Sequence, residues 1–262
     1  MDSKTADFSK VPEVTLGFWI VKIAATTLGE TAGDTVTMTL LHADKDAQNG
    51  GYLIGTALFF SVLVALVIWQ IAAKRFRPFL YWATIVASTT FGTAMADFAD
   101  RSLGVGYTGG SSLRLACVLA SLGLWYWSEG TISVNTVATP RVEAFYWAAI
   151  TFSQTLGTAL GDWMADTGNL GYRGGALVFL AALATTAGLY YWSNVSRVLL
   201  FWVAFILTRP LGATVGDVLD KPHSDGGLAL SRPLASAVLA TFILVCLLVL
   251  PQRAGRHTAA AE

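Results

Sequence analysis

Residues 146–162 read Tyr-Trp-Ala-Ala-Ile-Thr-Phe-Ser-Gln-Thr-Leu-Gly-Thr-Ala-Leu-Gly-Asp, and the pattern of this stretch occurs four times in the chain. In every copy a Gly lies ten residues after a Trp, and an Asp lies five residues after that Gly. An aromatic residue precedes each Trp, and a small residue lies four residues after each Gly. The four sets are Trp19, Gly29 and Asp34; Trp82, Gly92 and Asp97; Trp147, Gly157 and Asp162; and Trp202, Gly212 and Asp217. This repetition predicts a fold built from four copies of one unit.

The composition is atypical of a soluble domain. Hydrophobic residues make up 54% of the 262 residues and charged residues 13%, with a mean hydropathy of +0.57. Apolar windows of about 20 residues, the length that spans a bilayer, recur at 14–37, 52–72, 79–98, 111–128, 143–164, 174–193, 197–218 and 230–250. In lipid each window must be a helix, because a helix satisfies its own backbone polar groups. We therefore expect an all-α membrane protein with eight transmembrane helices in a single membrane domain, residues 1–262, and no cleaved signal peptide before the first window.

The eight windows pair into four two-helix repeats, at 14–72, 79–128, 143–193 and 197–250. The termini and the connections on their side hold nine basic residues: Lys4, Lys10, Lys74, Arg75, Arg77, Arg141, Arg197, Arg253 and Arg256. The opposite connections hold five: Lys45, Arg101, Arg173, Lys221 and Arg232. This bias predicts that both termini are cytoplasmic. Because each unit crosses twice, the repeats run parallel and should form a closed bundle, either pseudo-fourfold or nested twofold.

The repeated Trp and Gly also have structural interpretations. An aromatic pair at the start of a membrane helix is typical of an interfacial anchor, so we expect the four Trp side chains at the lipid–water boundary. A Gly followed one turn later by a small residue predicts close approach of helix backbones and turns the neighbouring Thr and Asp towards the bundle interior. Each Asp lies about 22 Å of helix beyond its Trp, near the outer end.

The repeated Asp residues carry the functional hypothesis. An ionisable side chain at the bilayer centre costs about 2.5 to 3.5 kcal/mol and is usually retained for a site, a pathway or an ion pair. Positions seven, 11 and 15 after each Trp share one helix face. They are Thr26, Glu30 and Asp34; Thr89, Thr93 and Asp97; Gln154, Thr158 and Asp162; and Arg209, Ala213 and Asp217. Carboxylate, hydroxyl and amide oxygens suit hard cations.

We therefore predict an ion site formed by Glu30, Asp34, Thr93, Asp97, Gln154, Thr158, Asp162 and Asp217, with the four Asp as metal ligands. The alternative is that the Asp residues lie shallow enough to be wet, where they pair with Arg101, Arg173 or Lys221.

Besides the basic residues near the helix ends, Lys22, Arg114 and Arg209 lie inside the predicted helices. Lys22 shares a helix face with Glu30, Arg209 precedes a Pro that loosens the helix, and Arg114 lies in the fourth helix. In a carrier such groups act as counter-ions or gates that release when a substrate or proton arrives. In a static structure they form fixed salt bridges, and the sequence leaves both interpretations open.

The four motifs resemble a bacterial membrane-protein family described as four tandem repeats of unknown function, each with two membrane helices and a characteristic Trp. The resemblance extends from Phe18 to about Leu250 and is carried by residues 26–34, 90–97, 155–162 and 210–217. Members are often labelled membrane-anchored proteins. The resemblance implies the architecture and adds no catalytic residue.

These observations favour a transporter of a hard cation, divalent ions included, driven by proton exchange or by the membrane potential. One alternative is a carrier or channel for a small organic or anionic solute bound by Arg209, Arg114 and Lys22. Another is a structural or regulatory membrane anchor without transport. The hypotheses are separable, because only the first requires the Asp residues to bind a cation.

Other classes find no support in the sequence. Hydrolase, metalloprotease and phosphate-loop motifs are absent, so we do not expect an enzyme or a cofactor. Three His and two Cys are too few for a site for soft metals, and 17 basic residues balance 17 acidic ones, which does not favour nucleic acid. The expected partners are an inorganic cation or proton and the lipid bilayer of a bacterial inner membrane, crossed several times. A homo-oligomer is left open.

Overall fold

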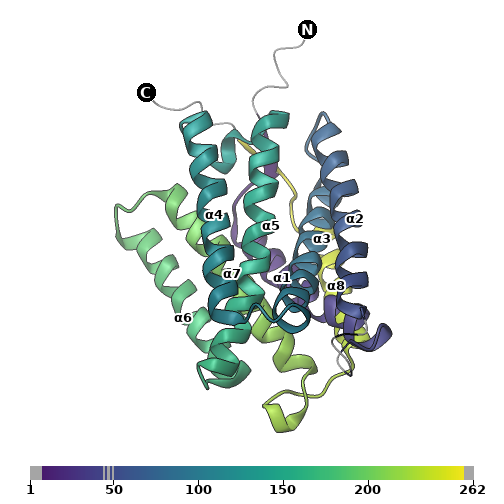
Figure 1. Ribbon diagram of the computed structural model, residues 1–262. Helices are drawn as coiled ribbons and strands as arrows, with labels where there is room; N and C mark the ends of the chain where they lie inside the picture. The colour runs from purple at the N-terminus through teal and green to yellow at the C-terminus, as the bar shows by residue number, and fades with distance from the viewer. Residues whose placement is uncertain (1–7, 44, 46–47, 49, 257–262) are drawn as a thin grey trace.

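The computed structural model describes residues 8–43, 45, 48 and 50–256, and this part of the chain is almost wholly helical (Figure 1). The long helices are α1 (Leu16–Asp34), α2 (Gly51–Ala72), α3 (Pro78–Asp97), α4 (Tyr107–Glu129), α5 (Pro140–Asp162), α6 (Gly171–Trp192), α7 (Arg197–Asp220) and α8 (Arg232–Val249). Three π-helical turns, η2 (Thr35–Leu40), η3 (Phe98–Ser102) and η5 (Trp163–Thr167), directly follow α1, α3 and α5. Two short 3₁₀ turns, η4 (Val134–Thr136) and η6 (His223–Asp225), and two strands, β1 (Phe8–Pro12) and β2 (Ala254–Arg256), complete the described chain.

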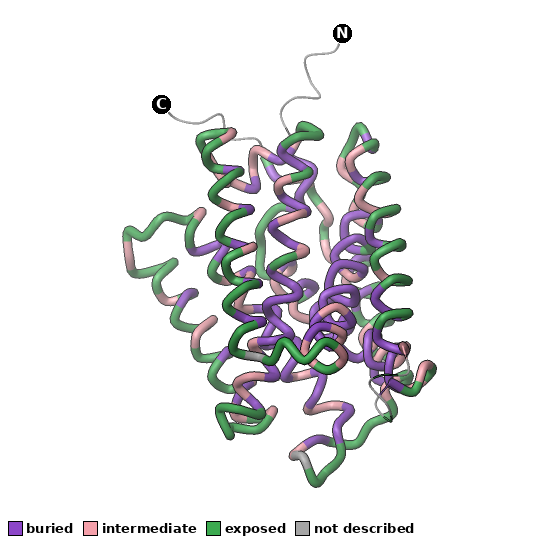
Figure 2. The backbone as a smooth tube through the Cα atoms, viewed as in Figure 1, coloured by how far each residue is buried: buried purple, intermediate pink, exposed green. Residues whose placement is uncertain are grey.

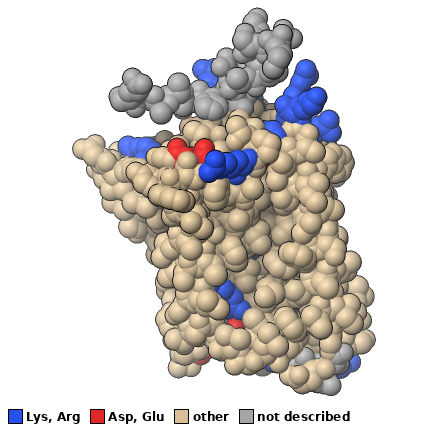
Figure 3. All heavy atoms as spheres, turned by 45° about the horizontal axis from the view of Figure 1, so that its top comes forward, with Lys and Arg blue, Asp and Glu red and all other residues tan. Residues whose placement is uncertain are grey.

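The predicted repeat of two helices is therefore present, and the membrane character is supported for part of it. In the described residues, α2, α6, α7 and α8 are long and apolar enough to cross a membrane by length and composition. The remaining long helices carry more polar residues, which in α1, α3 and α5 are largely buried Thr, Ser, Gln and acidic side chains. Figure 3 shows charged side chains gathered near the end that carries the termini, above a wide band of mostly uncharged surface.

The eight helices form two concentric rings. The inner ring is closed, because α1 packs against α3, α3 against α5, α5 against α7, and α7 against α1. Each outer helix packs on the inner helix of the next repeat: α2 on α3, α4 on α5, α6 on α7, and α8 back on α1. Figure 2 shows the outcome, with exposed residues along α2 and α4 and buried residues in the helices behind them. This is the closed bundle that the parallel repeat predicts.

Local sequence marks where the inner helices begin. Thr15, Thr139 and Ser196 precede α1, α5 and α7, and each side-chain oxygen accepts a hydrogen bond from a backbone N–H in the first turn. A Pro opens α3 and α5, where its missing N–H costs nothing. The inner helices begin three, four, seven and five residues before their Trp, so the contacts between neighbouring helices, and not the helix starts, bring equivalent residues of the four repeats together.

The repeated aromatic residues pack against one another inside the bundle, and not outwards as the expected interfacial anchors would. Trp82, Trp147 and Trp202 are at most 3% exposed, and Trp19 is partly buried against the same core. The aromatic residue before each Trp contacts the Trp of the next repeat, with ring centroids 5.5 to 6.3 Å apart, in the pairs Phe18–Trp82, Tyr81–Trp147, Tyr146–Trp202 and Phe201–Trp19. These eight residues form an aromatic collar that closes one end of the inner ring. Packing between repeats, rather than contact with lipid, therefore accounts for the aromatic pair.

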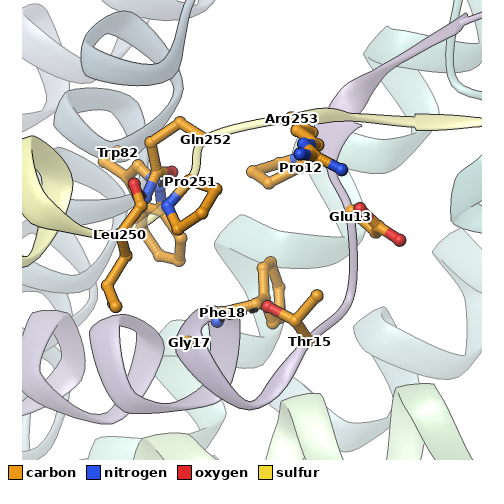
Figure 4. A pocket seen from close by; sticks show the side chains of 10 residues that line it. All are labelled: Pro12, Glu13, Thr15, Gly17, Phe18, Trp82, Leu250, Pro251, Gln252 and Arg253. Carbon is orange, nitrogen blue, oxygen red and sulfur yellow. Dashed lines mark hydrogen bonds between the residues drawn. The ribbon is translucent and has the colours of Figure 1, made fainter.

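The two terminal segments cover the collar. β1 pairs antiparallel with β2, and the backbone N–H of Lys10 donates to the carbonyl of Val137 at 2.7 Å. Behind them lies a cavity of about 350 Å³, whose lining includes Glu13, Phe18, Trp82 and Arg253 (Figure 4). The collar lies between this cavity and the repeated Asp residues, so the cavity is separate from them.

Replacing Lys10 with Met is expected to lower the free energy of unfolding by about 1 to 3 kcal/mol. The Lys10 ammonium forms an ion pair with the carboxylate of Glu143, which is fully buried, and also donates to the carbonyl of Ile71. Without Lys10 that carboxylate has lost its charge partner. Thermal unfolding in detergent measures the effect, and Lys10→Met with Glu143→Gln should recover part of it. A change no larger than that of Lys74→Met, at an exposed position, would contradict this account.

Candidate functional site

The first polar layer of the inner ring lies at the position seven residues after each Trp. Its members are Thr26, Thr89, Gln154 and Arg209, and each lies against the repeated Gly of the preceding helix in the ring: Gly212, Gly29, Gly92 and Gly157. A Cβ at Gly29 would lie 2.1 Å from Oγ1 of Thr89, and one at Gly157 2.2 Å from Cγ of Arg209. The predicted close approach of backbones is therefore present.

The second layer, four residues further along, converges on one guanidinium group. Nη2 of Arg209 donates to Oε2 of Glu30 at 3.0 Å, to Oγ1 of Thr93 at 2.7 Å and to Oγ1 of Thr158. This nitrogen carries two hydrogens, so the three acceptors share them. All four side chains are buried, and Arg209 is 0% exposed. One basic residue from the fourth repeat thus ties together the equivalent positions of the other three.

The third layer, which we call the acidic layer, contains the four repeated Asp residues, each at most 5% exposed. Nζ of Lys221 lies 2.9 Å from Oδ2 of Asp34 and 3.1 Å from Oδ1 of Asp217. Asp97 pairs instead with Arg101 of its own repeat at 2.8 Å. Asp162 makes no ion pair with another described residue. The four Asp therefore occupy equivalent positions with different partners.

Two further ion pairs give the end of the bundle that holds the repeated Asp residues a twofold character. Asp100 pairs with Arg114 at 3.0 Å, and Asp220 pairs with Arg232 at 2.9 Å. Both acids come three residues after a repeated Asp, and both Arg residues lie in the outer helix of the same repeat. Arg114 is thereby placed away from Arg209 and Lys22, with which the sequence groups it as a ligand. Its nearest acid, Asp100, accounts for its burial.

Three carboxylates come close enough to hold one ion. One oxygen each from Glu30, Asp34 and Asp217 lies within 4.8 Å of the others, and all three side chains are buried. In the described chain, Oδ1 of Asp34 and Oδ2 of Asp217 have no hydrogen-bond partner. Opposite ligands of a Ca²⁺ ion lie about 4.6 to 5.2 Å apart, from metal–oxygen distances of about 2.3 to 2.6 Å. The three oxygens therefore suit one hard cation, and the group leaves out Asp97 and Asp162 of the predicted set.

Beneath the carboxylates lie buried hydrogen-bond donors. Nζ of Lys22 sits 4.1 Å from the ring centroid of Phe205 and, within the described residues, has no hydrogen-bond partner. The same is true of both amide atoms of Gln154 and of Nε and Nη1 of Arg209. Lys22 and Gln154 are both 0% exposed. Gln154, predicted to ligate the ion, thus lies in the donor layer and not in the group of three carboxylates.

The charges near the repeated Asp residues stabilise one another. Burial lowers the pKa of Lys221, but the carboxylates of Asp34, Asp217 and Asp220 raise it by more. The pKa therefore lies well above its ordinary value. Burial raises the pKa of Asp100 above its ordinary value, although the nearby Arg114 and Arg101 offset part of this rise. Lys221 therefore stays protonated in the folded protein at neutral pH. Its stabilising contribution is fully present below the ordinary Lys pKa of about 10.4 and is lost only as the pH rises through the elevated value.

Sequence reasoning names Lys221 and Arg101 only as alternative partners for the Asp residues, and the structure gives them that place. The signal that identifies them is the spacing Asp97–Arg101 and Asp217–Lys221, four residues apart and so one turn along a helix. No local signal identifies the contact of Lys221 with Asp34, which is 187 residues away in the chain.

Comparison with known proteins gives one family. A family model described as Repeat of Unknown Function (DUF347) matches residues 17–76, 80–131, 145–196 and 200–253. These four segments cover most of the chain, and each begins within three residues of a repeat predicted from the sequence. No curated protein and no solved structure gives a match. The four-repeat organisation is therefore confirmed.

Proposed function

The chain belongs to the family built from the Repeat of Unknown Function (DUF347), and from its buried acidic layer we propose that it transports a hard cation across a membrane. The observation that carries this proposal is the group of three buried carboxylates, Glu30, Asp34 and Asp217, contributed by two adjacent inner helices. Buried acids in a membrane-embedded bundle are costly, and concentrating them in one group attracts cations.

The proposal includes a topology. All eight helices span the bilayer, both termini are cytoplasmic, and the protein resides in the inner membrane of a bacterium. The uncharged outer band and the shielding of polar side chains inside the ring support this arrangement. The more polar helices α1, α3 and α5 can then cross the membrane because their polar faces meet one another and not lipid. The acidic layer would face the opposite side of the membrane from the termini.

The basic residues supply a means of coupling. Arg209 and Lys221 now balance the carboxylates that would hold the ion. Binding of a cation at these carboxylates must weaken those ion pairs, which links substrate binding to rearrangement of the inner helices. A proton, or the membrane potential acting on the net charge, would drive the cycle. We propose transport and not catalysis for this site.

Replacing Asp217 with Asn is expected to weaken binding of Ca²⁺ by about tenfold or more, because the site loses one of its three carboxylates. Isothermal titration of detergent-purified protein with Ca²⁺, Mn²⁺, Mg²⁺ and Na⁺ measures the affinity. The matched control is Asp166→Asn, which changes an exposed acid in η5, the turn that follows α5. Equal weakening in both variants, or no saturable binding of any cation to any variant, would refute the cation site.

The unpartnered donors favour one second candidate, a carrier for a small anionic solute held by Lys22 and Arg209. This candidate predicts that an anion, and no cation, raises the unfolding temperature by mass action. The shift should disappear in Lys22→Met. A cation-dependent shift that survives Lys22→Met supports the first proposal and opposes the second, and a protein that responds to neither class fits a structural membrane anchor.

A further inference from the structure

We propose that the ammonium group of Lys221 is a built-in competitor of the transported ion, so that a divalent cation binds Asp34 and Asp217 by displacing it. This inference rests on the proposed function and adds two points: the charge of the substrate and the regulation of the site.

The position of Lys221 supports this role. Its Nζ lies between carboxylates from α1 and α7, 2.9 Å from Asp34 and 3.1 Å from Asp217. These two acids, with Glu30, form the group of oxygens that lie within 4.8 Å of one another. Each of the two also keeps a second oxygen that is buried and has no hydrogen-bond partner in the described chain, Oδ1 of Asp34 and Oδ2 of Asp217. The ammonium thus holds one oxygen of each acid and leaves acceptors that a metal ion can use.

Hydrogen bonds fix the backbone around Lys221, whereas its side chain is partly exposed to solvent. Lys221 directly follows α7, and its carbonyl accepts a hydrogen bond from Ala229 at 2.9 Å. The N–H of Leu228 donates to Val218 at 2.7 Å, which folds the connection back on α7. Gly227 packs so closely that a Cβ there would lie 2.0 Å from the Lys221 carbonyl oxygen. The side chain is 11% exposed, so rotation about its own bonds can carry the ammonium towards solvent without unfolding the connection.

The charges of the cluster favour a divalent ion. The acids Glu30, Asp34, Asp217 and Asp220 face three basic residues, Arg209, Lys221 and Arg232, at 4.0 Å or less. With all seven groups ionised the cluster carries one net negative charge. Replacement of the ammonium by a monovalent ion leaves that charge unchanged, whereas replacement by a divalent ion makes the cluster neutral. A buried cluster gains most from neutrality, because charges in a low dielectric are costly.

Lys221 also differs from its counterpart in the second repeat. Arg101 occupies the equivalent position, four residues after Asp97, and pairs with that Asp at 2.8 Å with its side chain 35% exposed. Beside Arg101, helix α5 contributes Thr158 at the position where α1 contributes Glu30 beside Lys221. The twofold-related location therefore lacks one carboxylate, and the described residues contain the group of three acids only beside Lys221.

The test compares Ca²⁺ binding to the full-length protein in detergent with binding to Lys221→Met, which keeps a similar side-chain length and removes the charge. Lys221→Met is expected to bind Ca²⁺ about tenfold or more tightly, because the ion no longer competes with a hydrogen-bonded ammonium. Na⁺ affinity should change less than Ca²⁺ affinity. Lys74→Met, a change of an exposed Lys, should leave both affinities as they are.

The outcomes separate the two proposals. Ca²⁺ binding that depends on Asp217 but is equal in wild type and Lys221→Met would overturn the role of Lys221 and keep the cation site. Weaker binding in Lys221→Met would also overturn it, because Lys221 would then support the ion and not compete with it. Absence of binding in both proteins would overturn the proposed function together with this inference.

A second measurement uses the wild-type protein alone, in case Lys221→Met does not fold. An activated ester acylates free amines, and mass spectrometry of the peptide that contains Lys221 reports how fast this amine reacts. The reaction should accelerate severalfold when Ca²⁺ saturates the site, since the displaced ammonium leaves its two carboxylates. An unchanged or slower reaction at saturating Ca²⁺ would show that the ion and the ammonium do not exchange.

Discussion

Replacing Arg209 with Met is expected to lower the free energy of unfolding by about 3 to 5 kcal/mol, the range for a buried ion pair that loses one partner. Arg209 is 0% exposed and Glu30 is 4% exposed, so the carboxylate that remains cannot recover its solvation from bulk water. Oγ1 of Thr93 and of Thr158 lose the same donor. Thermal or denaturant unfolding in detergent measures the effect, provided that it is two-state.

Two variants test whether the loss comes from the buried charge. Arg141→Met breaks the ion pair with Glu129, in which the Arg side chain is 71% exposed, and should cost less than about 1 kcal/mol. Arg209→Met combined with Glu30→Gln removes both charges and should recover most of the stability. A double variant as unstable as Arg209→Met would show that shape, and not charge, makes Arg209 necessary. Equal losses in Arg209→Met and Arg141→Met would refute the buried network altogether.

The parts of this fold that a local pattern controls could be predicted from the sequence. Gly29 and Glu30 show why: they are adjacent residues on one helix, so their directions differ by a known rotation. Once Gly29 is assigned to the contact with α3, a rotation of about 100° turns Glu30 to the contact with α7, where it packs against Gly216. The depth of each layer follows from the spacing after the Trp, and the closed ring follows from four units that run parallel.

The choice of ion-pair partners could not be predicted in the same way. Asp97 and Asp217 each have a basic residue one turn further along, yet Arg101 is 35% exposed and Lys221 bridges to Asp34 on a neighbouring helix. That difference depends on the path of the connection after α7, held by backbone hydrogen bonds to Val218, Leu219 and Lys221. Such long-range geometry leaves no periodic signal.

The Trp residues show a different limit. An aromatic residue at a helix end is compatible with a membrane interface and with a packed collar. The apolar amino-acid composition of the chain favours the membrane interface. What distinguishes them is the pairing of Tyr81 with Trp147 and of Tyr146 with Trp202 across repeats. Two consecutive aromatic residues indicate this arrangement, because each inner helix of a closed ring has two neighbours and packs one aromatic residue against each of them.

Replacing Gly29 with Ala is expected to lower the free energy of unfolding by about 3 kcal/mol or more, at the upper end for overpacking. The added Cβ would lie 2.4 Å from Cβ and 2.9 Å from the backbone carbon of Thr89, so rotation of the Thr side chain cannot relieve the clash. Separation of α1 from α3 would also lengthen the hydrogen bonds from Thr89 to Ala25 and from Thr93 to Gly29, both now 3.1 Å. The measurement is the unfolding midpoint in detergent, beside Gly123→Ala.

Gly123 is the matched control because it lies within α4 and a Cβ there meets nothing within 4 Å. Gly123→Ala should stabilise the protein by up to about 1 kcal/mol, since Ala loses less backbone entropy in a helix. Gly161→Ala should fall between the two, because its Cβ would lie 3.2 Å from Cβ of Ala213. An order of Gly29, Gly161 and Gly123 from most to least destabilising follows from contact between the inner helices. If Gly29→Ala is as mild as Gly123→Ala, the backbones of α1 and α3 do not approach as described, and the layers of Arg209 and Lys221 that depend on this approach cannot form.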